Sequence, residues 1–198
     1  LETSTQTTLF TYDADGSRIK KQTGSATTAY ISSLFEKDSS GETRKHIFAG
    51  STRIASITTN AVIPAQAGIH YYHGDHLGSS NIITNSTGAQ VQHCEYTPYG
   101  TFARNELSNG QTTQATNRYF TGKELDSTGL YFYAWRYYDP TIGRFCQPDT
   151  IIPEPYNPQT LNRYSYCDNN QLNYTDPTGH FAWFIPMIIG AIIGGIMG

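Results

Sequence analysis

Three histidines near the middle of the chain, His70, His73 and His76, are the first residues whose type and spacing suggest chemistry. Imidazole nitrogens are common zinc ligands, and a regular trio is a pattern that a metal site can use. In an extended strand, however, side chains three residues apart point to opposite faces, so these rings would not converge on one ion. We therefore expect no metal here and assign His73, with Asp75, to a structural turn.

Cysteine and phosphate chemistry are also weakly indicated. Cys94, Cys146 and Cys167 are odd in number and widely spaced, which fits neither a disulfide framework nor a Cys-x-x-Cys zinc site, so we interpret them as ordinary thiols. Residues 122–129 lack the Gly-Lys-Ser/Thr order of a phosphate-binding loop, and Lys123 is interpreted as a hairpin residue. No cofactor is predicted.

The composition indicates what kind of scaffold would position such residues. The chain of 198 residues contains 15 tyrosines, 9 phenylalanines and 18 glycines but only 15% charged residues. Aromatic residues favour strands and glycines favour turns, so we predict an all-β fold. The net charge of −3 and the absence of a dense Lys/Arg cluster argue against nucleic acid as a partner of this segment.

Alternating runs separated by turn residues predict a meander of hairpins. The first hairpin is expected at 9–23, around Asp-Ala-Asp-Gly, and a second pair of strands at 29–35 and 44–48. A further strand is predicted at 53–58. The alternating pattern returns at 70–79, and strands are predicted at 81–84, 91–96 and 130–138.

Four segments interrupt this rhythm. Residues 60–69 contain a proline and little alternation and are expected to form an inserted loop. Residues 105–116 are polar and are expected to form a mobile surface loop, and the proline-rich segment 147–158 can be neither a helix interior nor a central strand. The composition changes again at 179–181, where we place a domain boundary.

The last segment, residues 181–198, contains no charged residue. As a helix it would be marginally long enough to cross a hydrocarbon core of roughly 30 Å. Gly190, Gly194 and Gly198 would lie on one helix face, whereas Pro186 disrupts the early part. Three interpretations stay open: a membrane-inserting or translocation segment, a short apolar helix buried inside the protein, or the beginning of a longer domain.

A set of short motifs resembles the Rhs repeat-associated core, and Tyr12-Asp13 with Gly16 and Arg18 resembles a YD repeat. The resemblance covers roughly residues 9–179. The core motifs are His-Gly-Asp-His-Leu-Gly-Ser at 73–79, Tyr-Thr-Pro-Tyr-Gly at 96–100, Phe-Thr-Gly-Lys-Glu at 120–124, Gly-Leu-Tyr at 129–131, Arg-Tyr-Tyr-Asp-Pro at 136–140, Gly-Arg-Phe at 143–145 and Asn-Arg-Tyr at 162–164.

The resemblance implies a hollow β shell with the core as a plug at one end, immediately before a variable C-terminal effector; Tc-toxin C components are related shells. It implies four regions: YD-repeat hairpins at 1–59, the inserted loop at 60–69, the core at 70–180 and the apolar segment at 181–198. Because the chain begins in mid-pattern without an initiator Met or a signal peptide, we expect a piece of a longer protein.

The resemblance also implies candidate catalytic residues, because several relatives cut themselves after the core with paired aspartates. The matching positions are Asp149 and Asp176, with Arg144 or Arg136 to orient them and the cut between His180 and Phe181. Two close carboxylates cannot both ionise easily, so one can activate water while the other donates a proton. The sequence departs from the pattern around Asp149 and at His180, where Leu is common, and both aspartates could instead only form turns. Asp168 is a weaker candidate.

The leading functional prediction is a structural module that encloses and delivers a cargo, without a trans-acting enzyme activity. The alternatives are an intramolecular aspartyl autoprotease and a surface adhesion or carbohydrate-binding module. The expected partners are the C-terminal effector and an immunity protein or secretion component, with membrane contact through 181–198. The expected location is the cell surface or the extracellular space.

Overall fold

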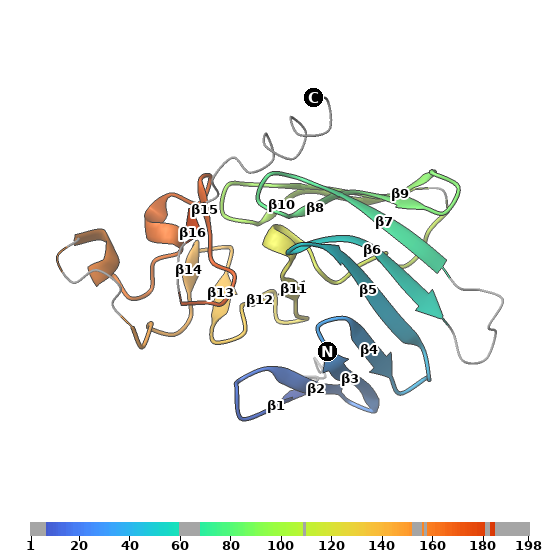
Figure 1. The fold of residues 1–198 in the computed structure, drawn as a ribbon, viewed down its shortest axis with the longest axis horizontal. Helices are drawn as coiled ribbons and strands as arrows, with labels where there is room; N and C mark the ends of the chain where they lie inside the picture. Colours follow the sequence, from blue (N-terminus) through green and yellow to red (C-terminus); the bar gives the residue numbers. More distant parts are fainter. Residues whose placement is uncertain are drawn as a thin grey trace, which may run out of the picture.

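The computed structural model describes residues 7–59, 68–108, 110–151, 156, 158–180 and 183–184. Its first half is a ten-stranded antiparallel sheet in which each strand pairs with the next along the chain. Figure 1 shows this sheet arching from β1–β4 at the bottom, through β5–β9 on the right, to β10 at the top. The predicted all-β meander is therefore confirmed. The strands are β1 (Thr8–Tyr12), β2 (Arg18–Thr23), β3 (Ala26–Ser32), β4 (Phe35–Asp38), β5 (Thr43–Ala49), β6 (Thr52–Thr59), β7 (Gly68–Gly74), β8 (Ser80–Asn85), β9 (Gln90–Tyr96) and β10 (Phe102–Leu107).

The second half is built from much shorter elements on the left of Figure 1. Four strands form a small sheet, and two more pair separately. The elements are the 3₁₀ turn η2 (Phe120–Gly122), β11 (Glu124–Leu125), β12 (Tyr131–Phe132), β13 (Tyr137–Asp139), β14 (Arg144–Phe145), the 3₁₀ turns η3 (Pro158–Leu161) and η4 (Cys167–Asn169), β15 (Tyr174–Thr175) and β16 (Trp183–Phe184).

The tight turns of the large sheet share one pattern: an Asp or Asn side chain that accepts backbone N–H groups, followed by a glycine with a positive φ. At β1–β2, the Oδ1 atom of Asp13 accepts the N–H groups of Asp15 and Ser17, and Gly16 adopts a φ of 76°. The positive φ is easily reached by glycine, and the Asp side chain satisfies backbone donors that no strand neighbour can reach. The same device recurs after Asp38, Asp75 and Asn85.

The main core is aromatic and lies between the large sheet and the second half of the chain. Tyr131, Tyr133, Tyr138 and Tyr166 are each at most 1% exposed and pack together with Phe120 and further buried side chains. Hydroxyl groups of the buried rings find partners: Tyr131 donates to the carbonyl of Gly100, and Tyr133 to the hydroxyl of Tyr166. These tyrosines are thus core residues, and their rings are not available to stack on a sugar.

Several local predictions need correction. The expected surface loop 105–116 begins inside β10, where Asn105 pairs with Cys94 of β9. The expected inserted loop 60–69 ends earlier, because β7 starts at Gly68; residues 60–67 lie outside the described part. The segment between residues 29 and 48 contains β4 as an additional strand.

The predicted aromatic strand 130–138 consists of two strands, β12 and β13, separated by a tight reversal. The carbonyl of Tyr133 accepts from the N–H of Trp135, the N–H of Tyr133 donates to the carbonyl of Arg136, and Ala134 takes a φ of 63°. An unbroken strand would point alternate side chains to two faces, whereas the reversal lets Arg136 reach the C-terminal loops.

The predicted apolar helix falls mostly outside the described residues. The described exceptions, Trp183 and Phe184, form β16 and pair with β15 instead of starting a helix. Among the described residues, no helix is long and apolar enough to cross a membrane.

Candidate functional site

Asp149 and Asp176, which come from separate loops, meet at the side chain of Arg136. The Nη2 atom of Arg136 lies 2.8 Å from Oδ2 of Asp149 and 3.4 Å from Oδ2 of Asp176. All three residues are at most 5% exposed. The structure thus brings together both aspartates that the sequence singled out, with Arg136, one of the two arginines considered, between them.

Arg136 is held from several sides after the β12–β13 reversal. Its guanidinium lies over the ring of Phe145, 3.6 Å from the ring centroid, which is a cation–π arrangement. Its Nε donates to the carbonyl of Gly179, and Nη1 donates to the carbonyl of Arg163 at 3.0 Å. A lysine could not make these contacts together, because they use the planar fork of the guanidinium.

Asp149 is tied to the backbone of the Asn-Arg-Tyr motif. Its N–H donates to the carbonyl of Arg163 at 2.8 Å, and the Nε of Arg163 donates back to the carbonyl of Asp149 at 2.5 Å. Oδ1 of the Asp149 side chain accepts the N–H of Ile151 at 3.0 Å. Sequence reasoning missed Arg163 as a supporting residue, although it belongs to one of the motifs of the family resemblance.

Asp176 forms a turn and also faces Arg136. Its Oδ1 atom accepts the N–H groups of Thr178, Gly179 and His180 at 2.6–3.1 Å, which leaves Oδ2 toward Arg136. Gly179 has a φ of 86°, and a Cβ there would meet the carbonyl oxygen of Tyr133. The turn interpretation is therefore correct for Asp176, but it accounts for only one of the two carboxylate oxygens.

Charge is unevenly compensated in this group, which we call the Arg136 cluster: Arg136, Asp149, Asp176 and His180. Burial raises the pKa of the Asp176 carboxyl, and it does so against the backbone N–H groups and the Arg136 charge that act in the other direction. Burial also lowers the pKa of Arg136, despite its two carboxylate neighbours. One arginine facing two buried carboxylates favours a state in which one carboxyl keeps its proton.

His180 adds an imidazole to the same cluster. Its Nδ1 lies 2.9 Å from Oδ1 of Asp149, and its ring packs beside that of Trp135, with centroids 5.3 Å apart. The sequence pointed to His180 only as the residue before the cut. Phe181, on the other side of the predicted cut, lies outside the described residues.

The other candidates lie elsewhere. Arg144 is exposed on β14, where its backbone pairs with Asp139 and Ser165. Asp168 lies in η4 with a φ of 51°. His73 contacts the hydroxyl of Thr84, and His76 contacts the carbonyl of Leu172, so the two rings are directed to different partners.

Lys123 does more than the hairpin role expected of it. Its Nζ donates to the carbonyl of Pro177 at 2.5 Å, in the turn that carries Asp176, and lies 5.0 Å from the centroid of the Tyr133 ring. Burial lowers its pKa to about 8, although the charge of Asp176 opposes that shift. The sequence around Lys123 contains no pattern that would predict its contact with Pro177, which lies far along the chain.

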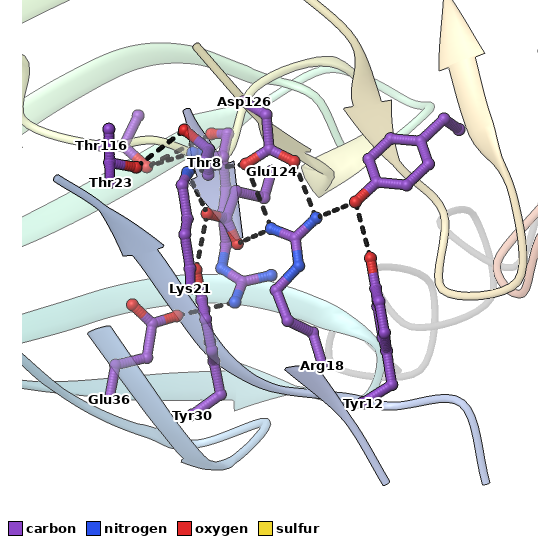
Figure 2. Close-up of polar contacts among 12 residues, drawn as sticks. Thr8, Tyr12, Arg18, Lys21, Thr23, Tyr30, Glu36, Thr116, Glu124 and Asp126 are labelled. Atoms are coloured by element: carbon purple, nitrogen blue, oxygen red, sulfur yellow. Dashed lines mark hydrogen bonds and ion pairs between the residues drawn. The ribbon is translucent and has the colours of Figure 1, made fainter. Parts of the chain in front are cut away.

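A second buried arginine joins the first hairpin to the second half of the chain (Figure 2). Arg18 binds Asp126 through both terminal nitrogens, at 2.7 and 3.1 Å, and lies 3.5 Å from Glu124. Lys21 contacts the same two carboxylates at 2.6 and 3.2 Å, and Tyr30 donates to Glu124. We call these five residues the Arg18 cluster.

The Arg18 cluster explains the YD-repeat motif physically. The guanidinium of Arg18 lies over the rings of Phe10 and Phe132, 4.3 and 3.9 Å from their centroids. Burial by itself would lower the pKa of Arg18, but hydrogen bonding to Asp126 and the charge of Glu124 raise it above the ordinary value. Arg18 therefore stays charged, and its contacts fasten two distant parts of the chain together.

Comparisons with known proteins agree with this architecture. Residues 58–172, more than half of the chain, match the family described as Teneurin YD-shell. The chain is 28% identical over 185 residues to a tRNA3(Ser)-specific nuclease WapA of Bacillus spizizenii, covering 89% of this chain and 8% of the relative. It is 39% identical over 102 residues to toxin subunit YenC2 of Yersinia entomophaga, covering 51% of this chain and 10% of the relative.

A crystal structure of TcdB2-TccC3 without its hypervariable C-terminal region has the same fold. It superposes with a TM-score of 0.72 at 26% identity, covering 87% of this chain and 9% of that chain. The chain therefore spans a tenth or less of the length of each of these three proteins. The ten-stranded meander, the family match and this superposition establish that the chain is a member of the YD-shell family.

Proposed function

We propose that this chain is the part of a YD shell that closes around, and helps to deliver, a toxin-type cargo. The observation that carries the proposal is the arching sheet, which is fastened to the second half of the chain by the Arg18 cluster. A sheet that arches in this way can surround a volume.

The differing names of the relatives support a carrier. One is named as a tRNA nuclease and another as a toxin subunit, yet both match this segment over a small part of their length. A segment shared by proteins with different activities is better explained as their common container than as the source of either activity. TcdB2-TccC3 has a hypervariable C-terminal region, and such a region is where a changing cargo would lie.

The cargo is accordingly the first proposed partner, as an effector that follows the core. Other toxin components, an immunity protein or a secretion component are further proposed partners, and the proposed location is extracellular or at the cell surface. The names of the toxin-type relatives support this location.

A chimaeric shell tests the carrier proposal. The segment of TcdB2-TccC3 that superposes on this chain is replaced by residues 1–180, and a protease is added to the assembled protein, which keeps its own C-terminal region. We expect this C-terminal region to be digested no faster than in the unchanged TcdB2-TccC3. Faster digestion of this region while the shell itself remains folded would disprove the proposal. A chimaera with Arg18→Leu is the control. It lacks the contacts that join the first hairpin to Glu124 and Asp126, so its C-terminal region should be digested faster.

The Arg136 cluster supports a second function, self-cleavage of the chain after His180. The supporting observation is the convergence of two buried carboxylates on one arginine nitrogen, next to the residue that would supply the carbonyl of the cut bond. A pair with uneven proton affinity is the requirement for acid and base to work together at one pH.

The proposed reaction is a hydrolysis of the peptide bond between His180 and Phe181. Asp149, held by Arg136, accepts a proton from water while the water oxygen bonds to the His180 carbonyl carbon. Asp176, whose pKa is raised by burial, donates its proton to the leaving nitrogen as the carbon–nitrogen bond breaks. The products are a carboxylate at His180 and an amine at Phe181.

Intact mass of the purified 198-residue chain tests this function. We expect loss of residues 181–198 from the wild type, and no loss from Asp149→Asn or Asp176→Asn, which keep the shape of each side chain but cannot exchange the proton. Asp168→Asn is the matched control and should be cut like the wild type. An uncut wild type, or cutting that persists in both variants, would disprove self-cleavage and leave the carrier proposal unaffected.

A further inference from the structure

His180 makes two different contacts in the Arg136 cluster, one through its backbone and one through its ring. Its backbone N–H donates to Oδ1 of Asp176 at 3.1 Å, and its ring nitrogen Nδ1 lies 2.9 Å from Oδ1 of Asp149. Its side chain is 14% exposed, and that of Asp149 is 8% exposed. The residue before the proposed cut therefore contacts both carboxylates, one through its backbone and one through its ring.

The contact with Asp149 has a defined direction. An ionised carboxylate only accepts hydrogen bonds, so Nδ1 must carry the proton when Asp149 is ionised. Oδ2 of Asp149 then binds Arg136 at 2.8 Å, while Oδ1 accepts from His180 and from the N–H of Ile151 at 3.0 Å. Donors on both oxygens fix the plane of the carboxylate, and the Trp135 ring limits the movement of the imidazole.

We propose that His180 is a positioning residue for self-cleavage, which orients Asp149 and thereby sets which peptide bond is cut. This inference rests on the proposed self-cleavage. The imidazole ties the base to the residue whose carbonyl is attacked, so the bond after His180 is placed by the same contact that prepares the base.

Charged groups from several elements face His180. They are Asp149 from the loop after β14, Asp176 from the turn after β15, and Arg136 from the β12–β13 reversal, with Lys123 beyond Asp176 at the Pro177 carbonyl. Among these contacts, the one between Nδ1 and Asp149 joins the His180 ring to the proposed base.

Two substitutions separate the donor from the charge. His180→Asn places an amide N–H near the position of Nδ1 but cannot become charged, whereas His180→Leu removes the donor. We expect His180→Leu to slow cleavage by about tenfold or more, as for loss of a hydrogen bond to a charged group. We expect His180→Asn to stay within about threefold of the wild-type rate at neutral pH, which is under half of that tenfold free-energy change.

The ring proton gives a readout that does not need cleavage. In an Asp176→Asn chain, which we expect to stay intact, nitrogen-15 NMR should show the neutral His180 ring protonated at Nδ1. A ring protonated at Nε2 would overturn the inference. So would a cut wild type in which His180→Leu is cut equally fast, or one in which His180→Asn is cut as slowly as His180→Leu.

The outcomes also separate this inference from the function on which it rests. An uncut wild type overturns both self-cleavage and the role of His180 in it. A cut wild type with one of the three contrary results above overturns the role of His180 alone, because Asp149 and Asp176 would then work without it.

Discussion

The Arg18 cluster and the Arg136 cluster are built from the same types of residue but differ in how their charges are paired. In each, a buried arginine lies over an aromatic ring and faces two buried carboxylates. At Arg18, Lys21 contacts both carboxylates directly, whereas at Arg136 the nearby Lys123 donates to a backbone carbonyl. The first cluster thus pairs two cations with two anions, and the second has one arginine for two carboxylates.

This difference in compensation separates the structural contact from the proposed cleavage site. The pKa of Arg18 is raised, and that of Arg136 is lowered because burial outweighs its carboxylate partners. In the Arg136 cluster, where one arginine faces two carboxylates, burial raises the pKa of the Asp176 carboxyl above its ordinary value. The arginines and carboxylates of the two clusters are similarly buried, so the number of cations explains the difference between the pKa shifts of Arg18 and Arg136.

Removing the arginine from the paired cluster should have the largest effect. Arg18→Leu leaves Glu124 and Asp126 buried with only Lys21, and breaking a buried ion pair from one side costs about 3–5 kcal/mol. We expect a loss of that size in the free energy of unfolding, measured by urea denaturation. The control, Arg104→Leu, removes an exposed arginine and should change stability by less than about 1 kcal/mol. Equal losses of unfolding free energy in the two variants would contradict the structural role of the Arg18 cluster.

Changing the arginine of the unpaired cluster should act on cleavage. Arg136→Lys keeps the charge but loses the fork that contacts Asp149 and the Gly179 and Arg163 carbonyls. Misplacement of catalytic groups by about 1 Å can cost about a hundredfold, and we expect that reduction in the cleavage rate, followed by intact mass over time. Arg18→Lys is the comparison and should cut at the wild-type rate; a slow Arg18→Lys would show that the rate reports folding only.

Removing the second cation should make the Arg18 cluster resemble the other one. Lys21→Met leaves one arginine for two carboxylates, and we expect a loss of about 1–2 kcal/mol in the free energy of unfolding at pH 7. Lys20→Met, on an exposed neighbour, is the control. An equal loss of stability in the two variants would contradict this explanation.

The smallest effect expected is a shift in the pH dependence of cleavage. Asp176 must be protonated to act as the acid, and its pKa is raised, so the rate should fall as pH rises through that value, on the alkaline side of the ordinary 3.8. Lys123→Met removes a cation near Asp176 and should move this limb to higher pH, as measured by cleavage rates across a pH series. A limb that moves to lower pH would show that Lys123 does not act through its charge.

The hairpin order was accessible from the sequence because its signals are local. Asp13 with Gly16, and Asn85 with Gly88, carry the turn chemistry within a few residues, and alternation marks the strands between them. The same local reasoning failed at 130–138, because the reversal at Ala134 depends on distant partners. The backbone there packs against Thr178 and Gly179, as the contact between Trp135 and Thr178 shows.

The candidate site was predicted only in part. Asp149 and Asp176 were identified through their motifs, but the choice of Arg136 over Arg144 required the tertiary structure. The two arginines lie close to the same small sheet, and only Arg136 follows a reversal that aims it at the aspartates. Arg163 and Lys123 reach the site through backbone carbonyls, and such contacts leave no pattern of residue types to recognise.

The sequence by itself determined the all-β class, the succession of hairpins and the family, since these follow from short-range alternation, turn residues and motifs. The tertiary structure decided which charges meet. Arg18 contacts Asp126 only after the arching sheet and the short C-terminal strands have packed together. The same holds for Asp149 and Asp176, which both contact Arg136. Charge compensation depends on distance and burial, and neither quantity can be obtained from the order of residues along a chain.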